Sequence, residues 1–293
     1  MSDFEGKVVI VTGAGGGLGR CHALAFAERG AKLVINDLGG GVHGDGQSDM
    51  ADAVVEEIKT AGGEAIANKA SVTDAEGAKS IVDDAVSAFG TVDILVNNAG
   101  ILRDKSYKNM TIDEFDLVLD VHLRGSNLVT RAAWPVMYEK NWGRIVFTSS
   151  TSGIFGNFGQ ANYGAAKMAM LGFMNVLAIE GASHNVRVNC LAPGAATRMT
   201  ASVPGSTFDA DNPPAEMDPS LVSPAVLYMC SEDAPSAVTI HASGGRYSRS
   251  QTYVNEGIAL GPEATFDEMM DSIDGVMDMS ASTPLDPVNR RRG

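Results

Sequence analysis

Cysteine is scarce in this chain of 293 residues, which contains three: Cys21, Cys190 and Cys230. They are far apart and odd in number, so they form neither the paired framework of a disulfide-rich domain nor the spacing of a zinc site. We therefore expect no metal centre and a reducing compartment, the cytoplasm. The C-terminal sequence Arg-Arg-Arg-Gly also lacks a peroxisomal signal of the Ser-Lys-Leu type.

Basic residues are also few. The chain has 22 Lys and Arg against 36 Asp and Glu, a formal net charge of −14 at pH 7. Because surfaces that bind nucleic acid are basic, this balance argues against a nucleic-acid partner. No run approaches the ~20 apolar residues of a membrane span, and the N-terminal sequence has no apolar signal region. With 44% hydrophobic and 20% charged residues, the composition predicts a globular protein with an ample core.

The chain opens with a strand, a glycine-rich turn and a helix. Residues 7–12 form an apolar run of strand length, which leads into the glycine-rich sequence 13–19 and then a helical stretch to Arg29. In dinucleotide-binding units such glycines let the backbone approach the pyrophosphate, whose charge is favoured at the helix N-terminus. A glycine pattern alone is weak evidence, so the flanking strand and helix carry the prediction.

An acidic residue, Asp37, ends the second expected strand, residues 32–36. At about 20 residues beyond the glycine turn, a carboxylate can bind both hydroxyls of an adenosine ribose and would repel a 2′-phosphate. No basic residue lies between Gly13 and Gly19 to offset that repulsion. We therefore predict NAD rather than NADP as the cofactor; a cap or turn role for Asp37 is the weaker alternative.

Strand-like and helical segments alternate along the rest of the chain. The alternation predicts an α/β fold, a single Rossmann-like doubly wound parallel sheet with helices on both faces. We place this domain at 1–260 and a C-terminal extension, packed on it or trailing from it, at 261–293. Further strands are expected at 64–69, 92–96, 143–149, 186–191 and 237–241, and helices at 50–60, 74–89, 112–139 with bends at Gly125 and Pro135, 160–182, 221–231 and 263–277.

A serine, a tyrosine and a lysine near the middle of the chain form a possible catalytic group. Ser150 follows a buried strand, and Tyr163 and Lys167 lie four apart on the next helix, hence on one face. A tyrosine titrates near ~10, and a neighbouring ammonium lowers that pKa toward neutral pH. Because a Tyr and a Lys one turn apart are more often an ordinary surface pair, the dinucleotide site upstream gives this group its weight.

A long segment between the sixth strand and the next helix, residues 197–219, is rich in Pro, Gly, Asp and Ser. A connection of that length is more often a lid or a binding loop than scaffold. Simple disorder is an almost equally good alternative.

Several motifs, in order, resemble the short-chain dehydrogenase/reductase family over nearly the whole chain. They are the turn at 12–19, Asp37, Asn-Asn-Ala-Gly at 97–100, Ser150, Tyr163 with Lys167, and Pro193-Gly194. The resemblance implies Ser150, Tyr163 and Lys167 as catalytic residues and a homodimer or homotetramer packed through two long helices. The cofactor contacts expected are Gly13, Gly17, Leu18, Gly19, Asp37, Ser71, Val72, Asn98, Ala99, Gly100, Tyr163, Lys167, Pro193 and Thr197.

A narrower resemblance is to the (3R)-hydroxyacyl-CoA dehydrogenase region of the type 2 multifunctional enzymes, also described as 17β-hydroxysteroid dehydrogenases. It rests on residues 36–40, 121–127, 130–137, 149–167 and 177–181. It implies NAD-dependent oxidation of a 3-hydroxyacyl-CoA, fatty or with a steroid side chain, to the 3-oxoacyl-CoA. A free 17β-hydroxysteroid is the alternative substrate, and a non-catalytic dinucleotide-binding scaffold the remote one. An anionic CoA would need local cations such as Arg103, Lys105 or Arg198.

The chain departs from the family pattern at three places. His122 stands where the family usually has asparagine, and it could relay protons or be a packed core residue. The threonine after Pro193-Gly194 comes one position early, at Thr197. The glycine-rich end of the last strand is replaced by the sequence at 242–247.

Overall fold

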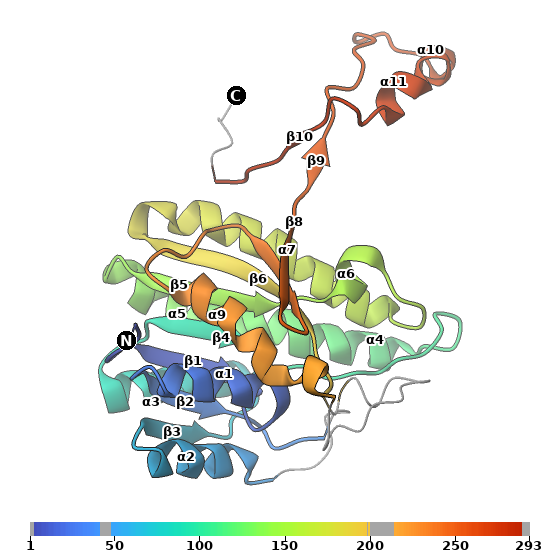
Figure 1. Cartoon of the computed structure of the whole chain (residues 1–293). Coiled ribbons are helices and arrows are strands. Elements are labelled where there is room, and N and C mark those ends of the chain that lie inside the picture. The colour runs from blue at the N-terminus through green and yellow to red at the C-terminus, as the bar shows by residue number, and fades with distance from the viewer. Residues whose placement is uncertain (1–2, 42–47, 198, 200–213, 289–293) are drawn as a thin grey trace.

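The computed structural model describes residues 3–41, 48–197, 199 and 214–288. An eight-stranded sheet carries the fold, in the order β3-β2-β1-β4-β5-β6-β7-β8 (Figure 1). All neighbours are parallel except β8, which runs antiparallel to β7. The strands are β1 (Val8–Thr12), β2 (Lys32–Asn36), β3 (Glu64–Asn68), β4 (Ile94–Asn97), β5 (Gly143–Thr148), β6 (Val186–Gly194), β7 (Thr239–Ser243) and β8 (Arg246–Ser250).

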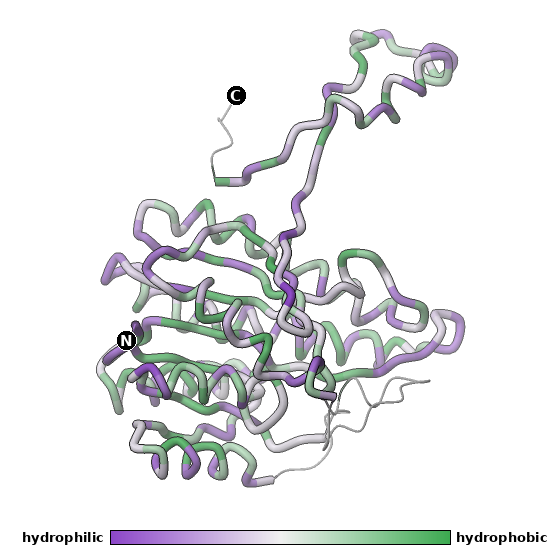
Figure 2. Tube along the Cα trace, in the orientation of Figure 1, coloured by the Kyte–Doolittle hydropathy of each residue, from purple (hydrophilic) through white to green (hydrophobic). Residues whose placement is uncertain are grey.

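Helices cover both faces of the sheet, which explains why the central strands are apolar throughout. Every residue of β1, β4 and β5 is buried, as expected for parallel strands covered on both sides. Figure 2 shows hydrophobic residues along the length of these strands. One face carries α1 (Gly17–Ala27), α2 (Met50–Thr60) and α9 (Ser223–Cys230), and the other α3 (Ala75–Phe89), α5 (Ser126–Glu139) and α7 (Ala161–Gly181). The predicted α/β fold is confirmed.

The strand order reverses between β1 and β4, which are neighbours although β2 and β3 lie between them in sequence. At such a switch point the loops leave the carboxyl ends of the two strands in opposite directions and open a crevice. Both the glycine turn and the segment after Asn97 start there, so the fold itself positions a binding site.

The structure adds local detail to the expected helices. The chain is helical over the whole expected range 112–139, but as α4 (Ile112–Leu119), a π-helical segment η1 (Asp120–Gly125) and α5. A short helix, α6 (Thr151–Phe155), lies between β5 and α7 and is capped by Ser150. The helix expected at 263–277 is two short ones, α10 (Phe266–Asp271) and α11 (Ile273–Met277). A π segment adds a residue to one turn and cannot be read from hydrophobic spacing.

After β8 the chain extends away from the eight-stranded sheet and its helices. Beyond it, a two-stranded ribbon of β9 (Tyr253–Val254) and β10 (Thr283–Pro284) leads out to α10 and α11, which stand clear of the sheet (Figure 1). Most side chains in this segment are exposed. It departs near residue 250, about ten residues before the division placed at 260, and that division stays a prediction.

In contrast to the sequence expectation that no run approaches a membrane span, the stretch 161–184, which contains α7, is long and apolar enough among the described residues to cross a membrane by length and composition alone. In this fold it packs against the sheet, with Met170, Met174 and Ala178 buried in the core. Helices in protein cores commonly have such a composition, so this is weak evidence for a span.

A buried histidine makes stability depend on pH. His22, on α1, is 0% exposed. Its Nδ1 lies 2.9 Å from the Ser223 hydroxyl, and its Nε2 has no partner among the described residues. Burial lowers the pKa of His22 to about 3. The folded state therefore excludes a proton that the unfolded state binds below its pKa of ~6.5.

We expect the contribution of His22 to the free energy of unfolding to be constant above pH 6.5 and to fall as the pH drops toward 3. Between pH 6.5 and 5 the loss is up to about 2 kcal/mol for this one group. Thermal unfolding at several pH values, compared between wild type and His22→Gln, measures it. The variant should show the shallower slope; equal slopes would contradict the account. His184→Gln, at a half-buried position, is the control.

Candidate active site

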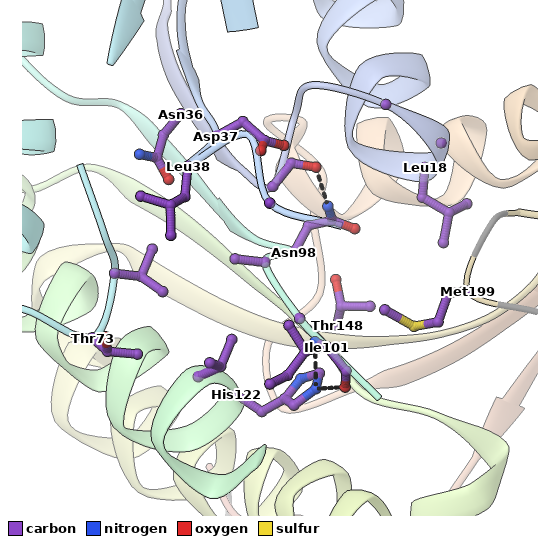
Figure 3. Close-up of a pocket in the computed structure, with 18 of the residues that line it drawn as sticks. Leu18, Asn36, Asp37, Leu38, Thr73, Asn98, Ile101, His122, Thr148 and Met199 are labelled. Atoms are coloured by element: carbon purple, nitrogen blue, oxygen red, sulfur yellow. Dashed lines mark hydrogen bonds between the residues drawn. The ribbon is translucent and has the colours of Figure 1, made fainter. Parts of the chain in front are cut away.

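A pocket of about 390 Å³ lies at the carboxyl ends of the central strands, within the ~300–1,000 Å³ usual for small-molecule sites. Figure 3 shows Leu18 and Asp37 in one part of it and Ile101 and His122 in another. Of the expected site residues, Gly19 and Ser150 do not line it. Those that do are Gly13, Gly17, Leu18, Asp37, Ser71, Val72, Asn98, Ala99, Gly100, Tyr163, Lys167, Pro193 and Thr197.

The glycine turn is closed by contacts that only glycine permits. A Cβ on Gly13, whose φ is +63°, would lie 2.8 Å from Ala99 Cα. A Cβ on Gly19 would lie 2.2 Å from the carbonyl oxygen of Gly13. Gly19 is therefore required for packing α1 against the turn rather than for lining the pocket. The N-cap residue of α1 is Gly16, which has no side chain to cap the helix with a hydrogen bond. An open helix N-terminus of this kind fits a pyrophosphate.

Two backbone groups hold the Asp37 carboxylate at the pocket edge. Its Oδ2 accepts a hydrogen bond from Gly15 N at 2.8 Å, and its Oδ1 accepts one from Gly39 N at 2.7 Å. Each carboxylate oxygen can accept a second bond. Asp37 can therefore receive ribose hydroxyls while remaining fixed, so the residues present fit a dinucleotide.

The segment after β4 is tied to the glycine turn by Thr12 and Asn98. The Thr12 hydroxyl accepts bonds from Asn98 N at 3.0 Å and Ala99 N at 3.1 Å. The Asn98 side-chain amide donates to the carbonyls of Thr12 and Gly13, both at 3.0 Å. These bonds hold the two sides of the switch point in register. Asn98 therefore supports the pocket as well as lining it.

Ser150, Tyr163 and Lys167 come together as their spacing predicted. The Ser150 side chain accepts a bond from Ser152 N at 3.1 Å and hydrogen-bonds Tyr163. Lys167 Nζ donates to Thr148 O at 2.6 Å and lies 5.4 Å from the centre of the Tyr163 ring. Ser150 thus contacts Tyr163, although it does not itself line the pocket.

Burial dominates the electrostatics of this group. It raises the pKa of Tyr163 to about 12, against the hydrogen bond from Ser150, which lowers it. It also lowers the pKa of Lys167 to about 7. For the chain by itself the pKa of Tyr163 is thus raised rather than lowered, because desolvation outweighs the hydrogen bond with Ser150. The ionisation of the pair in catalysis stays a prediction.

Sequence reasoning missed several lining residues: Asn36, Leu38, Ala70, Thr73, Ile101, Leu117, Val121, Thr148 and Met199. Asn36, Leu38, Ala70, Ile101 and Thr148 lie at or just beyond strand ends. Their position at the carboxyl ends of parallel strands was the available signal. Leu117 and Val121 come from α4 and η1, and only the helix register places them here.

The cations considered for a CoA are only partly available. Arg103 lines the pocket. Lys105 is paired with Glu114, with Nζ and Oε1 2.5 Å apart. Arg198 and residues 200–213 of the expected loop lie outside the described residues, so a lid over the pocket stays a prediction.

Comparisons with known proteins agree with this geometry. A family model described as short chain dehydrogenase matches residues 7–206. The chain is 47% identical over 297 residues to the peroxisomal multifunctional enzyme type 2 of Drosophila melanogaster, covering 99% of this chain and 48% of that enzyme. It thus spans about half the length of that relative.

Two mycobacterial proteins match along most of their own lengths. One is a putative short-chain type dehydrogenase/reductase of Mycobacterium tuberculosis, 46% identical over 260 residues, with 88% of this chain and 89% of that protein covered. The other is a crystal structure of a short chain dehydrogenase from Mycobacterium avium, with a TM-score of 0.80 and 39% identity. The structural match covers 97% of this chain and 98% of that one.

Proposed function

This chain belongs to the short chain dehydrogenase family, and we propose that it oxidises a 3-hydroxyacyl-CoA to the 3-oxoacyl-CoA with NAD as cofactor. One observation carries the proposal. A single pocket is lined by the glycine turn and Asp37 in one part and by Tyr163 and Lys167 in another. A dinucleotide held by the first part would extend toward the second.

In this mechanism the protein positions the substrate and manages one proton. Tyr163 takes the hydroxyl proton of the substrate, Ser150 orients the reacting oxygen, and Lys167 binds the nicotinamide ribose and stabilises the phenolate. A bound nicotinamide would supply the acceptor for the hydride on the carbon that carries the hydroxyl. Burial of the Tyr163 hydroxyl raises its pKa, which disfavours the phenolate.

The substrate class is inferred from the relatives. The Drosophila relative is named a peroxisomal multifunctional enzyme type 2, and a Saccharomyces cerevisiae relative, 51% identical over 233 residues, is named a peroxisomal hydratase-dehydrogenase-epimerase. From these names and the narrower resemblance described above, we infer that the dehydrogenase step of the present chain acts on a hydroxyacyl thioester. Oxidation of a free 17β-hydroxysteroid is the second candidate. A non-catalytic dinucleotide-binding scaffold is the remote one, and the close contact of Ser150 with Tyr163 argues against it.

NADH formation by the pure protein tests the proposal. We expect kcat/KM for a (3R)-3-hydroxyacyl-CoA to exceed that for estradiol at least 100-fold, since a pocket built for one class rejects the other through unmatched polar groups. A ratio near or below one would replace the acyl-CoA assignment by the steroid. No NADH from either substrate would reject dehydrogenation of both classes.

We also propose a homo-oligomer. The outer face of α7 exposes Met168, Val176 and Ile179 at 46%, 53% and 44%, and an apolar stripe of this kind fits a helix-to-helix contact with a second copy. For the location, the cytoplasm expected from the cysteines stays a prediction. The Drosophila relative is named as peroxisomal, and this compartment is the alternative for the present chain.

A further inference from the structure

His122 is a polar side chain of the pocket to which the mechanism above gives no role. It lies in the π-helical segment η1 and is 2% exposed. Its ring meets the Tyr163 ring edge-on, with centroids 5.2 Å apart and planes at 87°. Figure 3 shows its Nε2 bonded to the backbone of Ile101, which follows β4. His122 therefore contacts both the backbone of Ile101 and the ring of Tyr163.

The fold makes room for this imidazole. A Cβ on Gly100 would lie 2.3 Å from His122 Cε1, so the ring occupies space that only glycine leaves open. Burial and the charge of Lys167 hold the pKa of His122 well below its usual 6.5. The ring is neutral at physiological pH and carries one N–H.

Two backbone groups of Ile101 flank the same ring nitrogen. Nε2 lies 2.9 Å from Ile101 O and 3.2 Å from Ile101 N. In one tautomer Nε2–H donates to the carbonyl; in the other Nε2 accepts from the backbone N–H. Nε2 is bonded in either case. Nδ1 is then an acceptor in the first tautomer and a donor in the second.

Nδ1 is the unexplained atom. It is buried and has no hydrogen-bond partner within the described part of the chain, although its side chain lines the pocket. Buried polar atoms are rarely left unpaired, and such an atom in a pocket points to a ligand. We propose that His122 Nδ1 hydrogen-bonds a hydroxyl group of the molecule bound beside Tyr163, making His122 a binding residue of the site.

A hydroxyl suits this position because it can donate to Nδ1 or accept from it, matching both tautomers. Two hydroxyls are candidates, that of the nicotinamide ribose and that of the substrate. The identity of the ligand rests on the proposed function, whereas the role of Nδ1 as a binding group does not.

Two substitutions separate the two ring nitrogens. His122→Asn keeps a polar group near the position of Nδ1 and loses the bond to Ile101. His122→Gln can keep the bond to Ile101 and loses the group at Nδ1. We expect kcat/KM to be about tenfold higher for the Asn variant than for the Gln variant, as one hydrogen bond would give. We expect Tm to follow the opposite order.

If His122 had a purely structural role, the Gln variant would have both the higher kcat/KM and the higher Tm. That result would overturn the proposal. Equal turnover of the two variants would overturn it too. His184→Asn and His184→Gln, at a histidine bonded through Nδ1 to Tyr138 O, are the matched controls and should differ little in turnover.

Ring nitrogen NMR gives a test that does not need turnover. The His122 signals are identified by their absence from the spectrum of the Gln variant. A shift of Nδ1 on adding NADH alone would assign the ribose hydroxyl. A shift only after adding a 3-hydroxyacyl-CoA to the NADH complex would assign the substrate hydroxyl. No shift in either step would overturn the proposal. Wild type that fails to oxidise the thioester would refute the proposed function, while the NADH step would still decide the role of Nδ1.

Discussion

Tyr163→Phe is expected to lower kcat for oxidation of a 3-hydroxyacyl-CoA by about 10³-fold or more, within the range for loss of a positioned acid/base. The variant removes one oxygen atom, the one that hydrogen-bonds Ser150 and takes the substrate proton in the proposed mechanism. The ring remains, with its edge-on contact to His122. The change therefore acts on proton transfer and leaves the pocket in shape.

The dissociation constant of NADH, measured by its fluorescence, should change less than about threefold in this variant. Cofactor binding is a ground-state equilibrium and does not use the proton transfer that the substitution removes. Tyr107→Phe is a matched control, because Tyr107 is 77% exposed, and its turnover should equal that of wild type. Turnover of Tyr163→Phe within a factor of ten of wild type would mean that another group moves the proton, and would revive the non-catalytic scaffold for this site.

Asp37→Asn is expected to lower the preference for NAD over NADP about 100-fold in kcat/KM. Two unit charges ~4 Å apart interact by about 4 kcal/mol at an effective dielectric of ~20, and solvent reduces this at a partly exposed site. The substitution removes the charge that would repel a 2′-phosphate and keeps the shape of the side chain. The measurement is kcat/KM with each cofactor at saturating substrate.

One of the two bonds that Asp37 accepts, from Gly15 N or Gly39 N, is lost in the amide. Activity with NAD should therefore fall as well, but by less than the ratio changes. Asp83→Asn removes an exposed carboxylate on α3 that pairs with Lys79 and should leave the ratio unaltered. An Asp37→Asn enzyme that still rejects NADP as strongly as wild type would show that the pocket wall, and not this charge, selects the cofactor.

The parts of the fold that the sequence predicted are those determined by local patterns. β1 is a continuous apolar run followed by glycines that only a tight turn explains, so the strand, the turn and α1 could all be anticipated. Asp37 could be placed at the pocket because the end of β2 is fixed by the same pattern. Tyr163 and Lys167 could be placed on one face because they are four apart on a helix.

The parts that were missed depend on register or burial. β8, Arg246–Ser250, is mostly exposed and polar, so it has no apolar pattern to reveal it, and only its pairing with β7 makes it a strand. His122, which bonds to Ile101, lies in η1, and hydrophobic spacing does not reveal this π-helical register. The direction of the Tyr163 pKa shift depends on how deeply the fold buries the hydroxyl, and residue spacing does not contain that information.

The most direct test of the proposed reaction is to follow the hydride. A (3R)-3-hydroxyacyl-CoA with deuterium on carbon 3 is incubated with the pure protein and NAD, and both products are analysed by mass spectrometry. The account predicts one deuterium in the NADH for each 3-oxoacyl-CoA formed, and no such transfer in Tyr163→Phe over the same time. NADH without deuterium, or unchanged substrate under conditions where NADH binding is demonstrated, would contradict it.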